Sequence, residues 1–192
     1  MPCWPAAHAA LRLSLCVQDG GTTHAATVVG GVIVGDRFAE GFIEHGGDFN
    51  HGYTYSGHPV SAAVGLEVIR LYTEGGILAN GQKVGKQFEA GLKALTAHPL
   101  VGEARARGML GALELVSSKA AKTPLDPDLG VSERLFRHGY NNGIVFRAFG
   151  DGTIGLAPAL SCTEAEMEML LARLRRTLDA LLDERDIRAA LG

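Results

Sequence analysis

The stretch His51-Gly52-Tyr53-Thr54-Tyr55-Ser56-Gly57-His58-Pro59 combines glycines, hydroxyl side chains and the start of a helix. Pro59 suits a first helical position because its missing N–H group would have no intrahelical partner there. Hydroxyls and backbone N–H groups just ahead of a helix N-terminus offer donors and a favourable dipole to a dianion. The stretch therefore predicts a loop that binds an anion such as a phosphate ester, followed directly by a helix.

Apolar residues recur at helical spacing after Pro59, and the pair Gly75-Gly76 ends that run. Thr163 and Glu166 have the spacing of a capping box at the start of a final helix. The other segments predict a buried strand at 32–34, a helical turn at 37–43, helices at 78–97 and 132–141, strands at 109–116, 144–147 and 153–156, and an exposed loop at 117–129. This order indicates an α/β or α+β arrangement in which helices cover a small sheet, and we assign the class α/β.

The composition is that of a packed soluble protein, with 46% hydrophobic and 20% charged residues over 192 positions. A net charge of -3 gives no reason to expect nucleic acid or an anionic membrane as a partner. Cys3, Cys16 and Cys162 contain no C-x-x-C pair, which favours a reducing, cytoplasmic setting. His45, His51 and His58 match no standard ligand spacing, so we expect loop or capping histidines and no metal site.

Three stretches carry a resemblance: residues 30–37, the block 49–59, and residues 101–105 together with 108–115. They resemble one enzyme family, the class III (ω-type) aminotransferases, which use pyridoxal phosphate (PLP). The resemblance covers residues 30–184 and is nearest to putrescine– and ω-amino-acid–pyruvate transaminases. It implies the PLP-dependent transferase type I fold. Residues 30–58 would end the large PLP-binding domain, and residues 59–192 would form the connecting helix and the complete small C-terminal domain. Residues 1–29 would be a non-family segment, either disordered or a frameshift artefact.

The resemblance also implies a site. Gly52, Tyr53 and Thr54 would bind the PLP phosphate, and Thr54 would reach the cofactor of the neighbouring subunit in a homodimer. Arg147 would clamp the carboxylate of an amino or keto acid, because a planar guanidinium binds a carboxylate bidentately. The reaction would move an amino group from an amine or ω-amino acid to a keto acid such as pyruvate. From the residues alone, Thr54 could instead be an ordinary turn residue, and Arg147 could be an exposed or salt-bridged strand arginine.

One residue that the family needs is absent from this sequence. PLP chemistry requires a Schiff-base lysine, and no lysine precedes Lys83. By spacing from Gly30-Gly31 the lysine would fall near residues 19–21, where none occurs. We therefore expect no catalytic residue in this chain and no transaminase activity from it alone. The alternatives are a non-catalytic binding or dimerisation module, or one half of a split enzyme.

Overall fold

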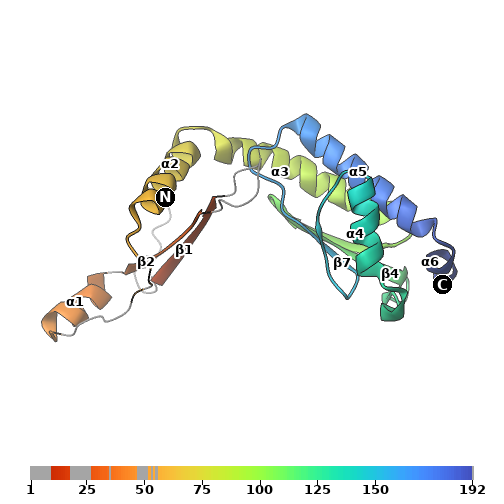
Figure 1. Ribbon diagram of the computed structural model, residues 1–192, viewed down its shortest axis with the longest axis horizontal. Helices are drawn as coiled ribbons and strands as arrows, with labels where there is room; N and C mark the ends of the chain where they lie inside the picture. Colours follow the sequence, from red (N-terminus) through yellow and green to blue (C-terminus); the bar gives the residue numbers. More distant parts are fainter. Residues whose placement is uncertain are drawn as a thin grey trace. The chain divides into compact units, whose positions relative to one another are not determined.

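The computed structural model describes residues 10–17, 27–34, 36–46, 52, 54 and 56–191. The chain divides into two compact units, Met1–Gly75 and Gly76–Gly192, and each is considered by itself. Figure 1 shows the elements of both units in chain order. Among the described helices, none combines the length and the apolar character that crossing a membrane demands.

The first unit contains a hairpin and two helices. Strands β1 (Ala10–Val17) and β2 (Thr27–Val34) pair antiparallel, with Ala10 opposite Val34 and Val17 opposite Thr27. Helix α1 (Asp36–Glu44) follows β2, and helix α2 (Pro59–Thr73) lies against the hairpin. The helix predicted to begin at Pro59 is confirmed, and the predicted turn at 37–43 is a full helix.

Strand β1 corrects one expectation. The sequence analysis predicts no strand before residue 32, yet residues 10–17 form one. The expectation was wrong because apolar residues do alternate there with shorter or charged ones, which is the period of a strand: Leu11, Leu13, Leu15 and Val17 against Arg12, Ser14 and Cys16.

The second unit is built on an antiparallel sheet with the strand order β3-β4-β7-β6. Its strands are β3 (Val101–Arg107), β4 (Leu110–Ser118), β6 (Arg147–Ala148) and β7 (Thr153–Leu156), and β5 (Thr123–Pro124) pairs with β4. The strands predicted at 109–116 and 153–156 are confirmed as β4 and β7. The loop predicted at 117–129 was wrong in part, since it holds β5 and the 3-10 helix η2 (Pro127–Leu129), and Leu125 there is buried.

The strand predicted at 144–147 is shorter and begins only at Arg147. The reason lies at the end of helix α4 (Val131–Asn141). There the backbone N–H of Ile144 donates to the carbonyl of Gly139 at 2.9 Å, which closes the helix end instead of extending a strand. Gly143 makes this closure possible because its φ of 72° lies in the left-handed region.

The helices of the second unit supply one core face. Helix α3 (Ile77–Ala94) continues into the 3-10 helix η1 (Leu95–Ala97), and helix α5 (Glu164–Leu182) precedes the short α6 (Arg185–Ala189). The capping box of Thr163 and Glu166 is present at the start of α5, as predicted. Fully buried side chains join α3, α4, α5, β4 and β7 in a single core: Val84, Phe88, Leu92, Leu113, Leu115, Leu135, Ile154, Leu174, Leu178 and Leu181.

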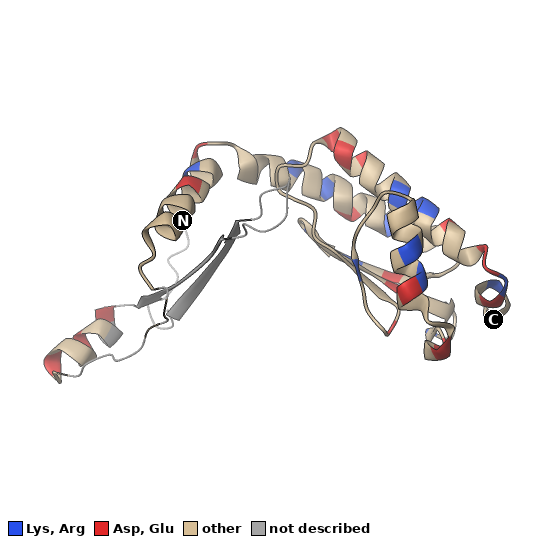
Figure 2. Cartoon of the chain, in the orientation of Figure 1, with Lys and Arg blue, Asp and Glu red and all other residues tan. Residues whose placement is uncertain are grey.

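Polar groups fix the ends of this unit. Glu184 accepts from Arg134 and lies 2.6 Å from Nε2 of His138, so the segment after α5 is tied to α4. Burial acts to raise the pKa of Glu184, but the hydrogen bonds from His138 and Arg134 outweigh it and hold the pKa below its ordinary value. Figure 2 shows that charged residues of both signs are mixed along α3, α4 and α5.

Candidate functional site

The predicted phosphate loop leads into α2. Gly52 and Thr54 are exposed, and Thr54 lies in a turn. Tyr53 lies outside the described residues, so its predicted role stays a prediction. His58 is the N-cap of α2, because its Nδ1 accepts the backbone N–H of Ser61 at 3.3 Å. The expectation of a capping histidine is therefore confirmed for His58.

The donor set of this loop suits a phosphate. An exposed threonine hydroxyl stands shortly before a helix that begins with proline. This helix N-terminus carries a partial positive charge, although Pro59 has no N–H group and the N–H of Ser61 already donates to His58. A dianion would meet neutral donors and a favourable dipole there. In the part of the chain that the structure describes, no three His, Cys, Asp or Glu side chains gather as a possible metal site.

Arg147 projects from the sheet face opposite the core. Cross-strand pairing places it in one row with Gly155 of β7, Ala112 of β4 and Arg105 of β3. Residues paired across antiparallel strands point to the same face. The neighbouring row contains Ile154 and Leu113, which are fully buried, so the row of Arg147 faces away from the helices.

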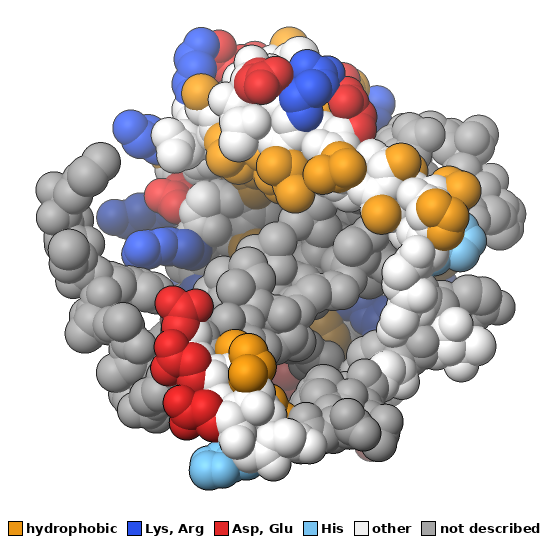
Figure 3. Space-filling view, turned by 90° about the vertical axis from the view of Figure 1, so that its left-hand side faces the viewer, with side chains coloured by type: hydrophobic (Ala, Val, Ile, Leu, Met, Phe, Trp, Pro, Cys, Tyr) orange, Lys and Arg blue, Asp and Glu red, His pale blue; other side chains and the backbone are white. Residues whose placement is uncertain are grey.

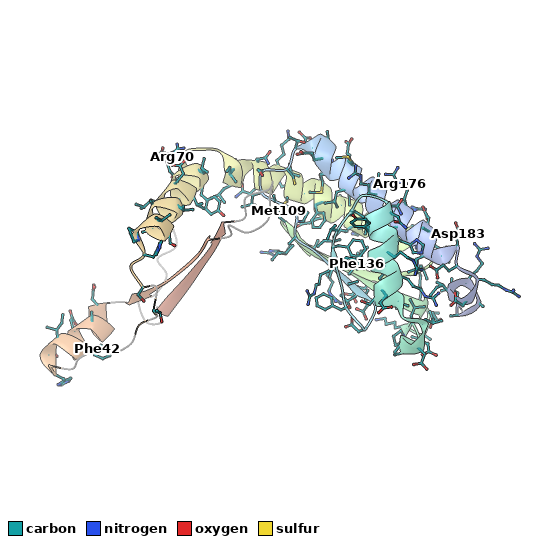
Figure 4. All side chains as sticks on the ribbon, in the orientation of Figure 1. Phe42, Arg70, Met109, Phe136, Arg176 and Asp183 are labelled. Atoms are coloured by element: carbon teal, nitrogen blue, oxygen red, sulfur yellow. The ribbon has the colours of Figure 1, made fainter. Side chains whose placement is uncertain are left out.

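A groove of about 800 Å³ is lined by three residues of α4 and by residues 145–150 of the segment around β6, Arg147 among them. The hydroxyl of Ser132 on α4 donates to the carbonyl of Ala148 at 3.3 Å, which ties the helix to the strand. Figure 4 labels Phe136, which stands on α4 and lines this groove. The remaining lining is mostly apolar, with one carboxylate: Glu133, Val145, Phe146, Phe149 and Gly150.

Within the described part of the chain, the guanidinium of Arg147 forms no ion pair. Its contact there is with Phe149, whose ring centroid lies 5.7 Å from Arg147 Cζ. By contrast, Arg105 on the same sheet face contacts Glu114 at 2.9 Å and Glu103 at 3.2 Å. Among the residues that the structure describes, Arg147 is therefore not the salt-bridged arginine of the first alternative interpretation. It fits the other alternative, an exposed strand arginine, and its carboxylate role stays a prediction.

The predicted site residues fall in both units. Gly52 and Thr54 belong to the first unit, and Arg147 belongs to the second. The sequence analysis did not single out Phe136 or Phe149 as lining residues. Phe149 lies just beyond the two residues of β6, so the alternation of side chains along a strand gave no sure signal for it.

The family follows from comparison with known proteins. The profile of the family described as Aminotransferase class-III matches residues 17–178. This is more than half of the chain, and the chain belongs to the class III aminotransferases. The family prediction is confirmed, and so is the fold prediction, since the similar solved structures are transaminases of the PLP-dependent type I fold.

Particular relatives lie within the same family. The chain is 39% identical over 160 residues to a putrescine–pyruvate aminotransferase of Pseudomonas aeruginosa, covering 83% of this chain and 34% of the relative. It is 36% identical over 193 residues to a diaminobutyrate–2-oxoglutarate transaminase of Halomonas elongata, covering 95% of this chain and 41% of the relative. The chain thus spans well under half the length of these curated relatives.

Solved structures give the same assignment. An (S)-enantioselective ω-transaminase from Thermomicrobium roseum matches with a TM-score of 0.76 and 34% identity, over 80% of this chain and 34% of that one. A PLP-bound aminotransferase mutant from Vibrio fluvialis matches with a TM-score of 0.73 and 34% identity, over 85% of this chain and 35% of that one. PLP is the cofactor of the intact enzymes of this family.

Proposed function

We propose that this chain is the C-terminal part of a PLP-dependent aminotransferase that moves an amino group from an amine or ω-amino acid to a keto acid such as pyruvate. The observation that carries the proposal is the placement of Arg147, unpaired with any described carboxylate, beside an apolar groove in a class III chain. A guanidinium with available in-plane N–H groups binds a carboxylate through two parallel hydrogen bonds. Relatives acting on putrescine and diaminobutyrate support a donor with a terminal amine.

The residues of this chain fit one part of the cofactor and not another. At the N-terminus of α2, Gly52, Tyr53 and Thr54 would hold a PLP phosphate. In a homodimer this PLP would be the one bound to the partner subunit. PLP, when bound, supplies the electron sink for transamination. The covalent attachment needs a lysine, and the sequence has none before Lys83. In this proposal the 192-residue chain binds the PLP phosphate and the substrate carboxylate. It has no lysine at the place where one would move the proton of the substrate carbon that bears the amino group.

Keto-acid binding tests the role of Arg147. Pyruvate titrated into the 15N-labelled chain should shift resonances around Arg147, and Arg147→Gln should abolish the shifts. Arg105→Gln is the matched control, because Arg105 lies on the same sheet face but is held by two carboxylates. If pyruvate shifts nothing in the native chain, or if both variants behave alike, the carboxylate role of Arg147 is wrong.

An activity assay tests the role of the missing lysine. The purified chain, supplied with PLP, putrescine and pyruvate, should form no alanine above the rate of free PLP. Sustained turnover by the chain alone, with a cofactor that borohydride fixes to the protein, would overturn the claim that the chain lacks a catalytic lysine.

A second candidate is one half of a split enzyme or a dimerisation module. The observation favouring it is the apolar surface of α2, where Val60 is 62% and Leu66 is 69% exposed. Figure 3 shows hydrophobic side chains on this helix and, separately, the row of carboxylates on α1. Large exposed apolar surfaces indicate a partner. Light scattering distinguishes the candidates, since a monomer at high concentration argues against dependence on another chain.

We further predict a cytoplasmic location.

A further inference from the structure

Phe149 lies where it can support the guanidinium of Arg147. The 5.7 Å separation between Arg147 Cζ and the centroid of the Phe149 ring is within the range of a cation–π contact. Arg147 lies in β6 and Phe149 follows the end of that strand, and both side chains approach the position that a Cβ of Gly155 would occupy. A guanidinium held over a ring still has N–H groups that can donate to another acceptor.

The ring has room because Gly155 lacks a side chain. Gly155 of β7 is the cross-strand partner of Arg147. A Cβ at Gly155 would lie 3.2 Å from Cε2 of Phe149 and 3.7 Å from Cβ of Arg147. The first distance is tighter than ordinary van der Waals contact, so the ring of Phe149 lies directly over the glycine. Any larger residue at 155 would displace the ring.

The backbone of Phe149 is held from two directions. Its N–H donates to the carbonyl of Thr153 at 2.9 Å, and its carbonyl accepts the N–H of Gly152 at 3.0 Å. Asp151 accepts the N–H of Thr153 at 2.9 Å and thereby fixes the same turn. The hydroxyl of Ser132 holds the preceding carbonyl, that of Ala148. The ring therefore stands on a braced turn, although the side chain itself is 45% exposed.

We propose that Phe149, seated on Gly155, is a positioning residue that orients Arg147 for a carboxylate. A free arginine side chain carries about 2 kcal/mol of rotamer entropy, part of which is lost when it binds an anion. Stacking on the ring restricts the side chain in advance and leaves its donors free, which is how pre-organisation raises affinity. The carboxylate part of this inference rests on the proposed function; the stacking does not.

Side-chain NMR of the full 192-residue chain tests the stacking. The Nε–H resonance of Arg147 should be shifted upfield by the ring and show restricted motion. Phe149→Leu should remove both effects, whereas Phe149→Tyr should preserve them. Gly155→Val is a second variant, which leaves the ring in the sequence but pushes it from its seat, and it should also remove both effects.

Pyruvate binding supplies a readout that a purely structural role would not move. In Phe149→Leu the dissociation constant for pyruvate should rise about two- to five-fold, the equivalent of an exposed cation–π contact, while Phe149→Tyr should restore it. An Arg147 resonance and pyruvate affinity that are the same in the native chain, Phe149→Leu and Gly155→Val would overturn the inference. If the upfield shift is present but pyruvate does not bind the native chain, the stacking stands and the carboxylate role of Arg147 fails.

Discussion

Replacing Gly111 of β4 by alanine should place a methyl group inside the core of the second unit. A Cβ there would lie 2.4 Å from Cδ1 of Leu92 and 2.8 Å from Cε1 of Phe88. Both side chains are fully buried on α3, so neither can swing into solvent. An extra methyl group in a packed core costs about 1–3 kcal/mol, and alanine gains roughly 0.5–1 kcal/mol over glycine in a strand. We therefore expect Gly111→Ala to lower the free energy of unfolding by the difference, on the order of 1–2 kcal/mol.

A double-variant cycle separates this overlap from other effects. Leu92→Ala alone should cost about 2–5 kcal/mol, because it empties a fully buried site. With both changes, the new methyl group at position 111 enters the space that Leu92 leaves. The combined loss should therefore be smaller than the sum of the two single losses by about 0.5–3 kcal/mol.

Urea denaturation of the full chain, followed by far-UV circular dichroism, measures all four free energies. Gly150→Ala serves as the control, since a Cβ at that glycine would meet nothing within 4 Å. Strictly additive losses would refute the reasoning, as would a Gly111→Ala variant that is as stable as the control.

Three other predictions concern pH, helix capping and the phosphate loop. Burial outweighs the attraction of Asp179 and lowers the pKa of His98 below its ordinary 6.5, so the unfolded chain takes up a proton that the folded chain does not. The free energy of unfolding is therefore unaffected by protonation of His98 above pH 6.5, and it falls by about 1.4 kcal/mol per pH unit between pH 6.5 and the lower pKa of the folded state. Urea titrations at several pH values should show that the free energy of unfolding of His98→Asn depends less steeply on pH. Thr163→Ala should cost about 1 kcal/mol in the same assay, because Thr163 Oγ1 accepts the N–H of Glu166 at 3.2 Å, and Thr163→Ser should restore most of it. In a preparation that binds PLP, Thr54→Val should weaken cofactor affinity about tenfold or more by fluorescence titration, while equal affinities for Thr54→Val and Thr54→Ser would contradict the hydroxyl's role.

Local signals in the sequence predicted most of the fold. The proline at the start of α2 and the capping box of α5 each act within a few residues, so their outcome does not depend on distant packing. Strand β5 was missed because its two residues form a strand only through pairing with β4, and their own sequence carries no strand signal. The start of β6 was misplaced because the N–H of Ile144 donates to the carbonyl of Gly139 at the end of α4. The positive φ of Gly143 allows this hydrogen bond, and no sequence pattern indicated it.

The residues of the candidate site also divide into those that local sequence signals predicted and those that depend on tertiary structure. The loop around Thr54 and the position of Arg147 followed from motif residues and from resemblance. Phe149 was missed as a partner of Arg147 because its seat is a glycine on another strand, which only the register of β6 with β7 brings beside it. The buried position of His98 was likewise invisible, since it depends on packing after η1.

The two outer strands of the second unit's sheet bear on how the protein behaves at high concentration. At one edge, β3 exposes a run of charged side chains, namely Glu103, Arg105 and Arg107, and at the other edge β6 is two residues long. Charged or very short edge strands prevent another chain from adding to a sheet by backbone hydrogen bonding. Neither edge of this sheet therefore offers a template for ordered β-aggregation, so fibres should not grow by addition of strands to the second unit.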